Sequence, residues 1–338
     1  MKKFLPFLFL LAFTTSISTA QQTGDFYIGF PSPDSLLTED SVHLYFHVPA
    51  SYQQGVPSKL IVGIHGLGNP QTPEQIRNYF SPTADSLNTI VVCPKPYITQ
   101  PVSIDHPRSK LVINIALDSV LQWYSIDTNE LFIAGYSAGS DIASRYTLEQ
   151  PKYRMKGLIW YAPGFFYQPN LSAQIEFPHT CLCFGDADPL SNILGQVTSI
   201  RDSFANSPFE LFYNEIPGID HTMEFPNFTR EMLECFRFMN DPVNFVPDSS
   251  YVGGKIISAT ALNFHPNPTT GKIIFEGNLF SEVENLQVLD LSGKIIFETV
   301  KVKENQEINI TGQTPGTYIV RAQVKGENYL GRLVLIEK

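Results

Sequence analysis

The sequence predicts two domains of different architecture: a doubly wound, mainly parallel α/β sheet over residues 21–240 and a small antiparallel β-sandwich over residues 257–338. In the first part, short apolar runs alternate with helix-like stretches, which is typical of a parallel sheet with helices on both faces. Residues 241–256 contain Pro, Asp, Ser and Gly without periodicity, which predicts a linker. Beyond them only short alternating runs with Gly-centred turns follow, as in a sandwich.

The first twenty residues have the pattern of a secretory signal peptide. Two lysines precede an apolar run that is too short to span a bilayer, and small residues follow it. Ser18 and Ala20 fit the small-x-small cleavage rule, so we expect cleavage after Ala20. No other segment of the sequence approaches membrane-spanning length.

Strands and helices of the first domain follow from local patterns. Short β-branched or aromatic runs predict strands at residues 42–48, 60–66, 89–94, 131–136, 157–163, 180–185 and 209–216. Helical periodicity predicts helices at residues 110–124 and 139–150, and a last one in the stretch that ends near Asn240.

Composition excludes one class of partner. The net charge is −10 and charged residues make up only 17% of the chain. A nucleic-acid partner would require clustered Lys and Arg, so none is expected.

The four cysteines predict little by themselves. A disulfide is possible in an exported protein. Cys181 and Cys183 lie two apart in a predicted strand, share a face and make a poor pair. Buried free thiols are the favoured interpretation.

The stretch "LFIAGYSAGSDIASRY", residues 131–146, places a serine at a tight strand-to-helix turn. Ser137 lies between Gly135 and Gly139, where any side chain would collide with the neighbouring strand and helix. The flanks favour a nucleophile over an ordinary turn, and the amide of Ala138 at the helix N-terminus would face negative charge.

A serine nucleophile requires a general base, which in this architecture follows the acid in the chain. The histidines downstream of Ser137 are His179, His221 and His265. His265 falls in the second domain and His179 opens a strand. His221 lies just past the strand 209–216, which makes it the candidate base.

The orienting acid is expected in the loop after the preceding strand. "CLCFGDADPL" offers Asp186 and Asp188, and the loop shape favours Asp188. Asp186 fits a surface turn residue. Asp220 ranks third, because residues adjacent in sequence to a base such as His221 rarely point at it.

Donors for the oxyanion and a substrate pocket complete the predicted site. In "IVGIHGLGNP" the loop after a strand could turn the Leu67 amide toward Ser137, to pair with that of Ala138. His65 is expected to form structural hydrogen bonds. The aromatic residues that follow strand ends either line an acyl or aryl pocket or pack in the core; they are Tyr97, Trp160, Phe165, Phe166 and Tyr167.

On these motifs, residues 40–240 resemble an alpha/beta-hydrolase, most closely the small secreted esterases of the polyhydroxybutyrate depolymerase and feruloyl esterase type. The resemblance rests on the HG loop, the GYSAG elbow, GDAD and GIDH. It implies the triad Ser137, Asp188 and His221. Family members often carry Gly or Asn after the elbow serine, where this chain has Ala138.

Residues 257–338 resemble the C-terminal sorting domain of type IX secretion. The segments "NFHPNPTTGKIIFEG", "LQVLDLSGKIIFET" and "PGTYIVRAQVKG" carry the resemblance, together with the terminal "GRLVLIEK". It implies export through the periplasm and outer membrane, to the surface or the medium, and the type IX machinery as partner. A generic carbohydrate-binding sandwich is the alternative.

Together these features predict an exported serine hydrolase that cleaves a small-molecule or polymer-borne carboxylic ester by a Ser-His-Asp acyl-enzyme mechanism. The mechanism requires no metal or organic cofactor. A peptidase or amidase of the same fold is one alternative, and a surface binding protein with a vestigial hydrolase fold is another.

Overall fold

The structure is a computed structural model of the chain. It describes residues 22–37, 41–67, 72–99, 103–149, 151–164, 171, 176–193, 196–207, 209–222, 224, 227–242, 244–246, 254–257, 260–261, 264–275, 283–290, 293–300, 306–324 and 327–337.

A nine-stranded sheet forms the centre of the first part, in the order β1-β2-β4-β3-β7-β8-β9-β10-β11. The strands are β1 (Gly24–Pro31), β2 (Ser41–Val48), β3 (Ser58–Ile64), β4 (Thr89–Pro94), β7 (Ile126–Tyr136), β8 (Gly157–Tyr161), β9 (His179–Gly185), β10 (Leu211–Ile216) and β11 (Gly254–Ile257). The pairings from β4 to β10 are parallel, and those at the two edges are antiparallel. A separate hairpin joins β5 (Ile98–Thr99) to β6 (Ser103–Ile104).

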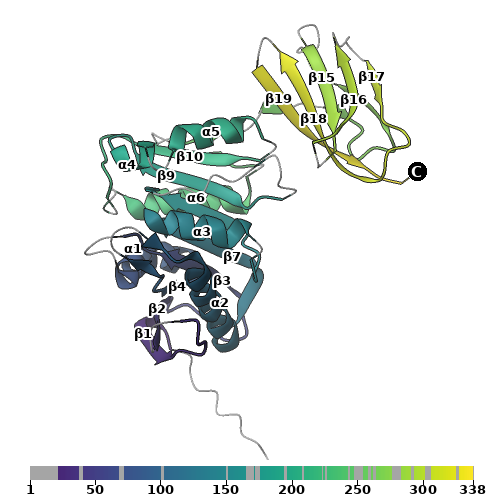
Figure 1. The fold of residues 1–338 in the computed structure, drawn as a ribbon. Coiled ribbons are helices and arrows are strands. Elements are labelled where there is room, and N and C mark those ends of the chain that lie inside the picture. The colour runs from purple at the N-terminus through teal and green to yellow at the C-terminus, as the bar shows by residue number, and fades with distance from the viewer. Residues whose placement is uncertain are drawn as a thin grey trace, which may run out of the picture.

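Helices cover both faces of this sheet (Figure 1). One face carries α1 (Pro73–Leu87) and α6 (Phe228–Asn240), whose apolar side chains share a buried cluster with the strands. The other carries α2 (His106–Trp123), α3 (Ala138–Leu148) and α5 (Val197–Ala205), which pack into a second cluster. The short α4 (Pro189–Ile193) follows β9. The doubly wound, mainly parallel sheet predicted from the sequence is therefore confirmed.

Local sequence explains where the first helix begins and ends. The Thr72 side chain accepts a hydrogen bond from the Gln75 amide, and Pro73 occupies the first turn, where its missing N–H costs nothing. The helix ends at Asn88, which adopts the left-handed conformation that asparagine tolerates. Strand β4 starts directly after it, with all of its residues buried because helices lie on both faces.

From residue 260 onward, the regular secondary structure of the described residues consists of strands. A five-stranded sheet has the order β12-β19-β18-β15-β16, and a three-stranded sheet has the order β13-β14-β17. The strands are β12 (Thr260–Ala261), β13 (Phe264–His265), β14 (Lys272–Phe275), β15 (Val283–Leu289), β16 (Ile295–Val300), β17 (Glu307–Asn309), β18 (Gly316–Val324) and β19 (Glu327–Leu335). Residues of both sheets share one apolar core, which confirms a small, largely antiparallel β domain.

The predicted linker over residues 241–256 is wrong at its end. Residues from Gly254 onward form β11, which pairs antiparallel with β10. Within the same stretch Phe245 is buried and packs edge-on against Phe212. Lack of periodicity concealed both features, since a single aromatic anchor and a four-residue edge strand give no repeating pattern. The boundary between the two domains stays a prediction.

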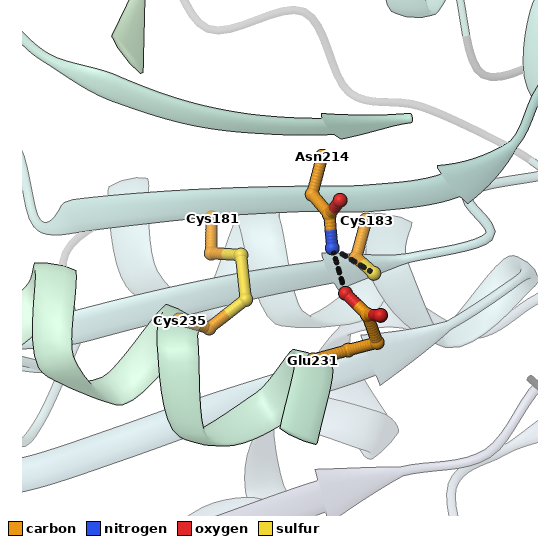
Figure 2. The surroundings of a disulfide bond; sticks show 5 residues. All are labelled: Cys181, Cys183, Asn214, Glu231 and Cys235. Carbon is orange, nitrogen blue, oxygen red and sulfur yellow. Dashed lines mark hydrogen bonds between the residues drawn. A yellow bond between two sulfur atoms is a disulfide. The ribbon is translucent and has the colours of Figure 1, made fainter. Parts of the chain in front are cut away.

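The expectation of free thiols is wrong for two of the four cysteines. A disulfide joins Cys181 in β9 to Cys235 in α6 (Figure 2), whereas Cys93 and Cys183 are free and buried. Cys181 and Cys183 share a face, as predicted, and that face is the one covered by α6. The sequence separation of 54 residues gave no local sign of this pairing.

Beside the disulfide lies a buried hydrogen-bonded set, Cys183, Asn214 and Glu231, which we call the Asn214 network (Figure 2). The Asn214 amide nitrogen donates to Glu231 Oε2 at 2.6 Å and to Cys183 Sγ at 3.2 Å. It ties β9, β10 and α6 together at one point.

Among the helices that the structure describes, none is both long enough and apolar enough to cross a membrane.

Candidate active site

Ser137 occupies the turn between β7 and α3 with a backbone that side chains rarely adopt. Its φ is 52° and its ψ is −123°. A Cβ atom added at Gly135 would lie 2.3 Å from the Gly139 carbonyl oxygen, and one at Gly139 would lie 2.3 Å from the Ile64 carbonyl oxygen. The two glycines thus allow the helix to start directly against the neighbouring strand, as the sequence predicted. The strained turn presents the Ser137 side chain beyond the end of the sheet.

The structure brings three of the predicted residues together at the carboxyl ends of the parallel strands. His221 Nε2 lies 2.9 Å from Ser137 Oγ, and His221 Nδ1 lies 2.9 Å from Asp188 Oδ2. Because an ionised carboxylate only accepts, Nδ1 carries the proton and donates to Asp188, which leaves Nε2 free to accept from the serine hydroxyl. The imidazole is therefore held in the tautomer that a general base requires.

Asp188 is fully buried yet keeps its charge. Its Oδ1 accepts from the amides of Leu190 at 2.9 Å and Ser191 at 3.0 Å, and its Oδ2 accepts from the Ser191 hydroxyl at 2.5 Å as well as from His221. Burial raises the pKa of Asp188, but the hydrogen bonds from His221 and Ser191 outweigh it, so the pKa lies below its ordinary value. We call Ser137, Asp188, Ser191 and His221 the Asp188 network.

The rival acids and bases lie elsewhere. Asp186 accepts from the Gly218 amide at 2.6 Å in a surface turn, as its type suggested, and Asp220 is exposed. His179 opens β9 at the opposite end of the strands, where burial lowers its pKa. His265 lies in β13 of the C-terminal sheets. Position in the fold thus favours Asp188 and His221.

The predicted oxyanion donors lie on adjoining segments. Ala138 is the first residue of α3 and is buried, and Leu67 lies in the loop after β3. The two segments adjoin because Gly139 packs against the carbonyls of Ile64 and His65. That the Leu67 and Ala138 amides bind an oxyanion stays a prediction.

His65 has the structural part expected of it. Its Nδ1 lies 2.7 Å from the Gly66 carbonyl oxygen, to which it donates. Burial lowers its pKa to about 4, so the ring is neutral at physiological pH and is not a candidate cation.

Of the five aromatic residues considered for a substrate pocket, the structure describes two. Trp160 is fully buried in the core and donates its ring N–H to the Ser144 hydroxyl at 2.7 Å, so its prediction as a pocket residue is wrong. It lies inside β8 rather than after it, and its side chain points into the helix-covered face. Tyr97 is partly buried against the same core. Phe165, Phe166 and Tyr167 lie outside the described residues.

Three residues near the site were not found by sequence reasoning. Tyr136 stacks on the His221 ring, with centroids 5.5 Å apart and planes 26° apart. Gly164 leaves space at the nucleophile, because a Cβ atom there would lie 2.8 Å from Ser137 Oγ. Ser191 contacts Asp188. The only signal in the sequence was position, since Tyr136 adjoins the elbow serine and Ser191 follows the acid by three residues.

Among the described residues, no group of three or more His, Cys, Asp and Glu side chains is arranged to hold a metal ion.

Comparison with known proteins defines both parts. Residues 263–337 match the family model of the secretion system C-terminal sorting domain. No curated protein matches the chain in sequence.

Solved structures resemble the first part at low identity. Esterase 2 of Thermogutta terrifontis is 13% identical, with 67% of this chain and 97% of that chain covered and a TM-score of 0.50. A poly(3-hydroxybutyrate) depolymerase, LpqC of Bordetella parapertussis, is 16% identical, with 68% and 92% covered and a TM-score of 0.47. A ferulic acid esterase of Anaeromyces mucronatus is 16% identical, with 62% and 88% covered and a TM-score of 0.47.

The first part therefore has the alpha/beta-hydrolase fold. The C-terminal part is a sorting domain that directs the protein through type IX secretion to the cell surface or beyond.

Proposed function

We propose that this exported chain is a serine hydrolase that cleaves carboxylic esters through an acyl-enzyme. The observation that carries the proposal is the unbroken hydrogen-bonded series from Asp188 through His221 to the strained Ser137. Three side chains far apart in sequence meet in the geometry and tautomer that nucleophilic catalysis requires.

The reaction follows from these contacts. His221 Nε2 removes the proton of Ser137 as Oγ attacks the ester carbonyl, and the oxyanion that forms is stabilised by the amides of Ala138 and Leu67. The C–O bond to the leaving alcohol then breaks, and His221 returns the proton to that alcohol. Water attacks the acyl-enzyme with the same base, releases the acid and restores the serine. Asp188 stabilises the imidazolium at each stage.

An ester is favoured over an amide by the name of one neighbour in fold, esterase 2 of Thermogutta terrifontis. That argument is by analogy, since fold alone does not fix function. A peptidase of the same fold would use the same residues. A vestigial hydrolase that only binds would have no need for the saturated, buried charge of Asp188.

Labelling with a fluorophosphonate probe tests the nucleophile without a known substrate. We expect the wild type and Ser207→Ala to react, and Ser137→Ala not to. Ser207 is a matched control because it is a buried serine whose hydroxyl, among the described residues, bonds to the carbonyls of Phe204 and Phe209 and to the Phe209 amide. Absence of labelling in the wild type would refute the proposal.

Turnover of p-nitrophenyl acetate and butyrate against peptide anilides separates the two reaction types. We expect hydrolysis of the esters only, and a fall of about 10⁶-fold in kcat for Ser137→Ala. Faster turnover of the anilides would instead assign a peptidase.

A further inference from the structure

The Asp188 network contains one side chain that the proposed mechanism does not use. Ser191, on α4, is fully buried and its hydroxyl donates to Asp188 Oδ2 at 2.5 Å. The same oxygen accepts the Nδ1 proton of His221 at 2.9 Å. Ser191 and His221 thus contact one atom from two different segments, the helix α4 and the loop after β10.

The two oxygens of Asp188 have different surroundings. Oδ1 accepts from the backbone amides of Leu190 and Ser191, in the turn that starts α4, and this bonding fixes the carboxylate to its own loop. Oδ2 is the oxygen that accepts the hydrogen bond from the His221 imidazole. Among the described residues, Oδ2 has two side-chain contacts: the ring of His221, which is the base, and the hydroxyl of Ser191.

The direction of the Ser191 bond follows from chemistry. An ionised carboxylate has no proton to give, so the hydroxyl must donate. A charge-assisted O–H···O⁻ bond of this length belongs to the stronger class of hydrogen bonds in proteins. Because Ser191 and Asp188 are both fully buried, removal of the hydroxyl leaves Oδ2 without that donor rather than exposing it to solvent.

We propose that Ser191 is a positioning residue for the reaction, which sets the orientation and the charge of the Asp188 oxygen that holds His221. This inference rests on the proposed function. Ser191 touches neither substrate nor reacting atoms; it acts through the carboxylate.

Removal of the donor has a consequence for pH dependence. Without it, the pKa of Asp188 is lowered less, and the more concentrated charge on Oδ2 attracts a protonated imidazole more strongly. The stronger attraction is what would keep the base protonated to higher pH. Among the described residues, the Tyr136 phenol also packs against the ring; burial and then the Asp188 charge hold the pKa of Tyr136 above its ordinary value, so it stays neutral over the range measured.

The test compares Ser191→Ala, Ser191→Thr and the matched buried control Ser207→Ala in the full chain. The rate of fluorophosphonate labelling is measured as a function of pH, together with the melting temperature. For Ser191→Ala we expect the plateau rate to fall about tenfold and the midpoint of the rising limb to move up by ~0.5–1 pH unit. Ser191→Thr, which retains the hydroxyl, should have a midpoint nearer to the wild type.

Two results would overturn the proposal. One is a Ser191→Ala profile that superimposes on the wild type; the other is an equal shift in Ser207→Ala, which would make the effect merely structural. If Ser191→Ala does not fold, Ser191→Cys replaces it under the same criteria, because a thiol is a weaker donor of similar shape. An unlabelled wild type would defeat the proposed function itself, which is a distinguishable outcome.

Discussion

Two buried polar networks depend on the same pair of strands, β9 and β10, and their carboxyl groups behave in opposite ways. In the Asp188 network the acid follows β9 and the base follows β10, and hydrogen bonds lower the pKa of Asp188 despite complete burial. In the Asn214 network the residues lie within the strands and on α6, and burial raises the pKa of Glu231, which the Asn214 bond only partly offsets.

The difference shows what keeps a buried carboxylate charged. Asp188 receives four hydrogen bonds, from two amides, one hydroxyl and one imidazole. In the Asn214 network one polar atom, Asn214 Oδ1, is buried with no hydrogen-bond partner among the residues described. Donors are concentrated around the carboxylate of the proposed active site, and the second network lies in the packing between sheet and helix.

Of the changes that test this comparison, Asp188→Asn is expected to have the largest effect, and that effect is on kcat. The amide cannot stabilise the imidazolium and can reverse the tautomer of His221, so kcat should fall about 10⁴-fold. Ester turnover and fluorophosphonate labelling measure it. Glu231→Gln is the matched change in the other network and should leave kcat within about twofold. Equal losses in both variants would remove the distinction between the networks.

Loss of the disulfide should act on stability instead. Cys181 and Cys235 are 54 residues apart in the sequence. For a loop of that length, the loop-closure entropy predicts that removing the bridge lowers the free energy of unfolding by roughly 4 kcal/mol. The double variant Cys181→Ala/Cys235→Ala, unfolded in urea, measures it. Reduced wild type is the control and should behave alike, with kcat per folded molecule unchanged. An unaltered unfolding midpoint would contradict the prediction.

Gly164→Ala tests the space at the nucleophile. The new methyl group would lie 2.8 Å from Ser137 Oγ and 3.7 Å from His221 Cε1, so either the hydrogen bond or the substrate must move. We expect kcat/KM to fall about 10²-fold with little change in melting temperature. Wild-type activity in this variant would show that the space beside the serine is not used.

The smallest effect concerns Glu231 and pH. Because burial raises the pKa of Glu231 in the folded state, the folded protein binds more protons than the unfolded chain just above the ordinary glutamate pKa, so this group's contribution to stability falls as pH rises. Glu231→Gln removes that loss. Relative to wild type, the variant should gain stability at pH 8 compared with pH 5, measured by urea unfolding at both. If the variant shows the same difference in stability between pH 5 and pH 8 as the wild type, another group is responsible for that difference.

Sequence predicted the sheet and the three side chains that meet at its end because both leave regular marks. Parallel strands covered on both faces appear as continuous apolar runs, and the elbow glycines around Ser137 are forced by backbone contact. Chain order and position just past the strand 209–216 then favoured His221 as the base, although its catalytic role, like that of Asp188, is still a proposal.

The disulfide and the other unpredicted features depend on contacts that leave no periodic pattern in the sequence. The Cys181–Cys235 bond requires α6 to lie across β9, and Ser191 becomes a partner of Asp188 only once α4 starts with the turn it has. Trp160 was wrongly predicted to line the pocket, because its aromatic type alone does not indicate whether it lies within a strand or after the strand ends. Gly164 shows no signal until the chain after β8 is folded back over the serine.

Strand β11 has a consequence for any processing of the C-terminal part. It covers the outer hydrogen-bonding edge of β10, which would otherwise present unpaired amide and carbonyl groups to other chains. A processed chain that ended before Gly254 would have an unpaired sheet edge open to self-association, whereas one that ended after Ile257 would keep that edge covered.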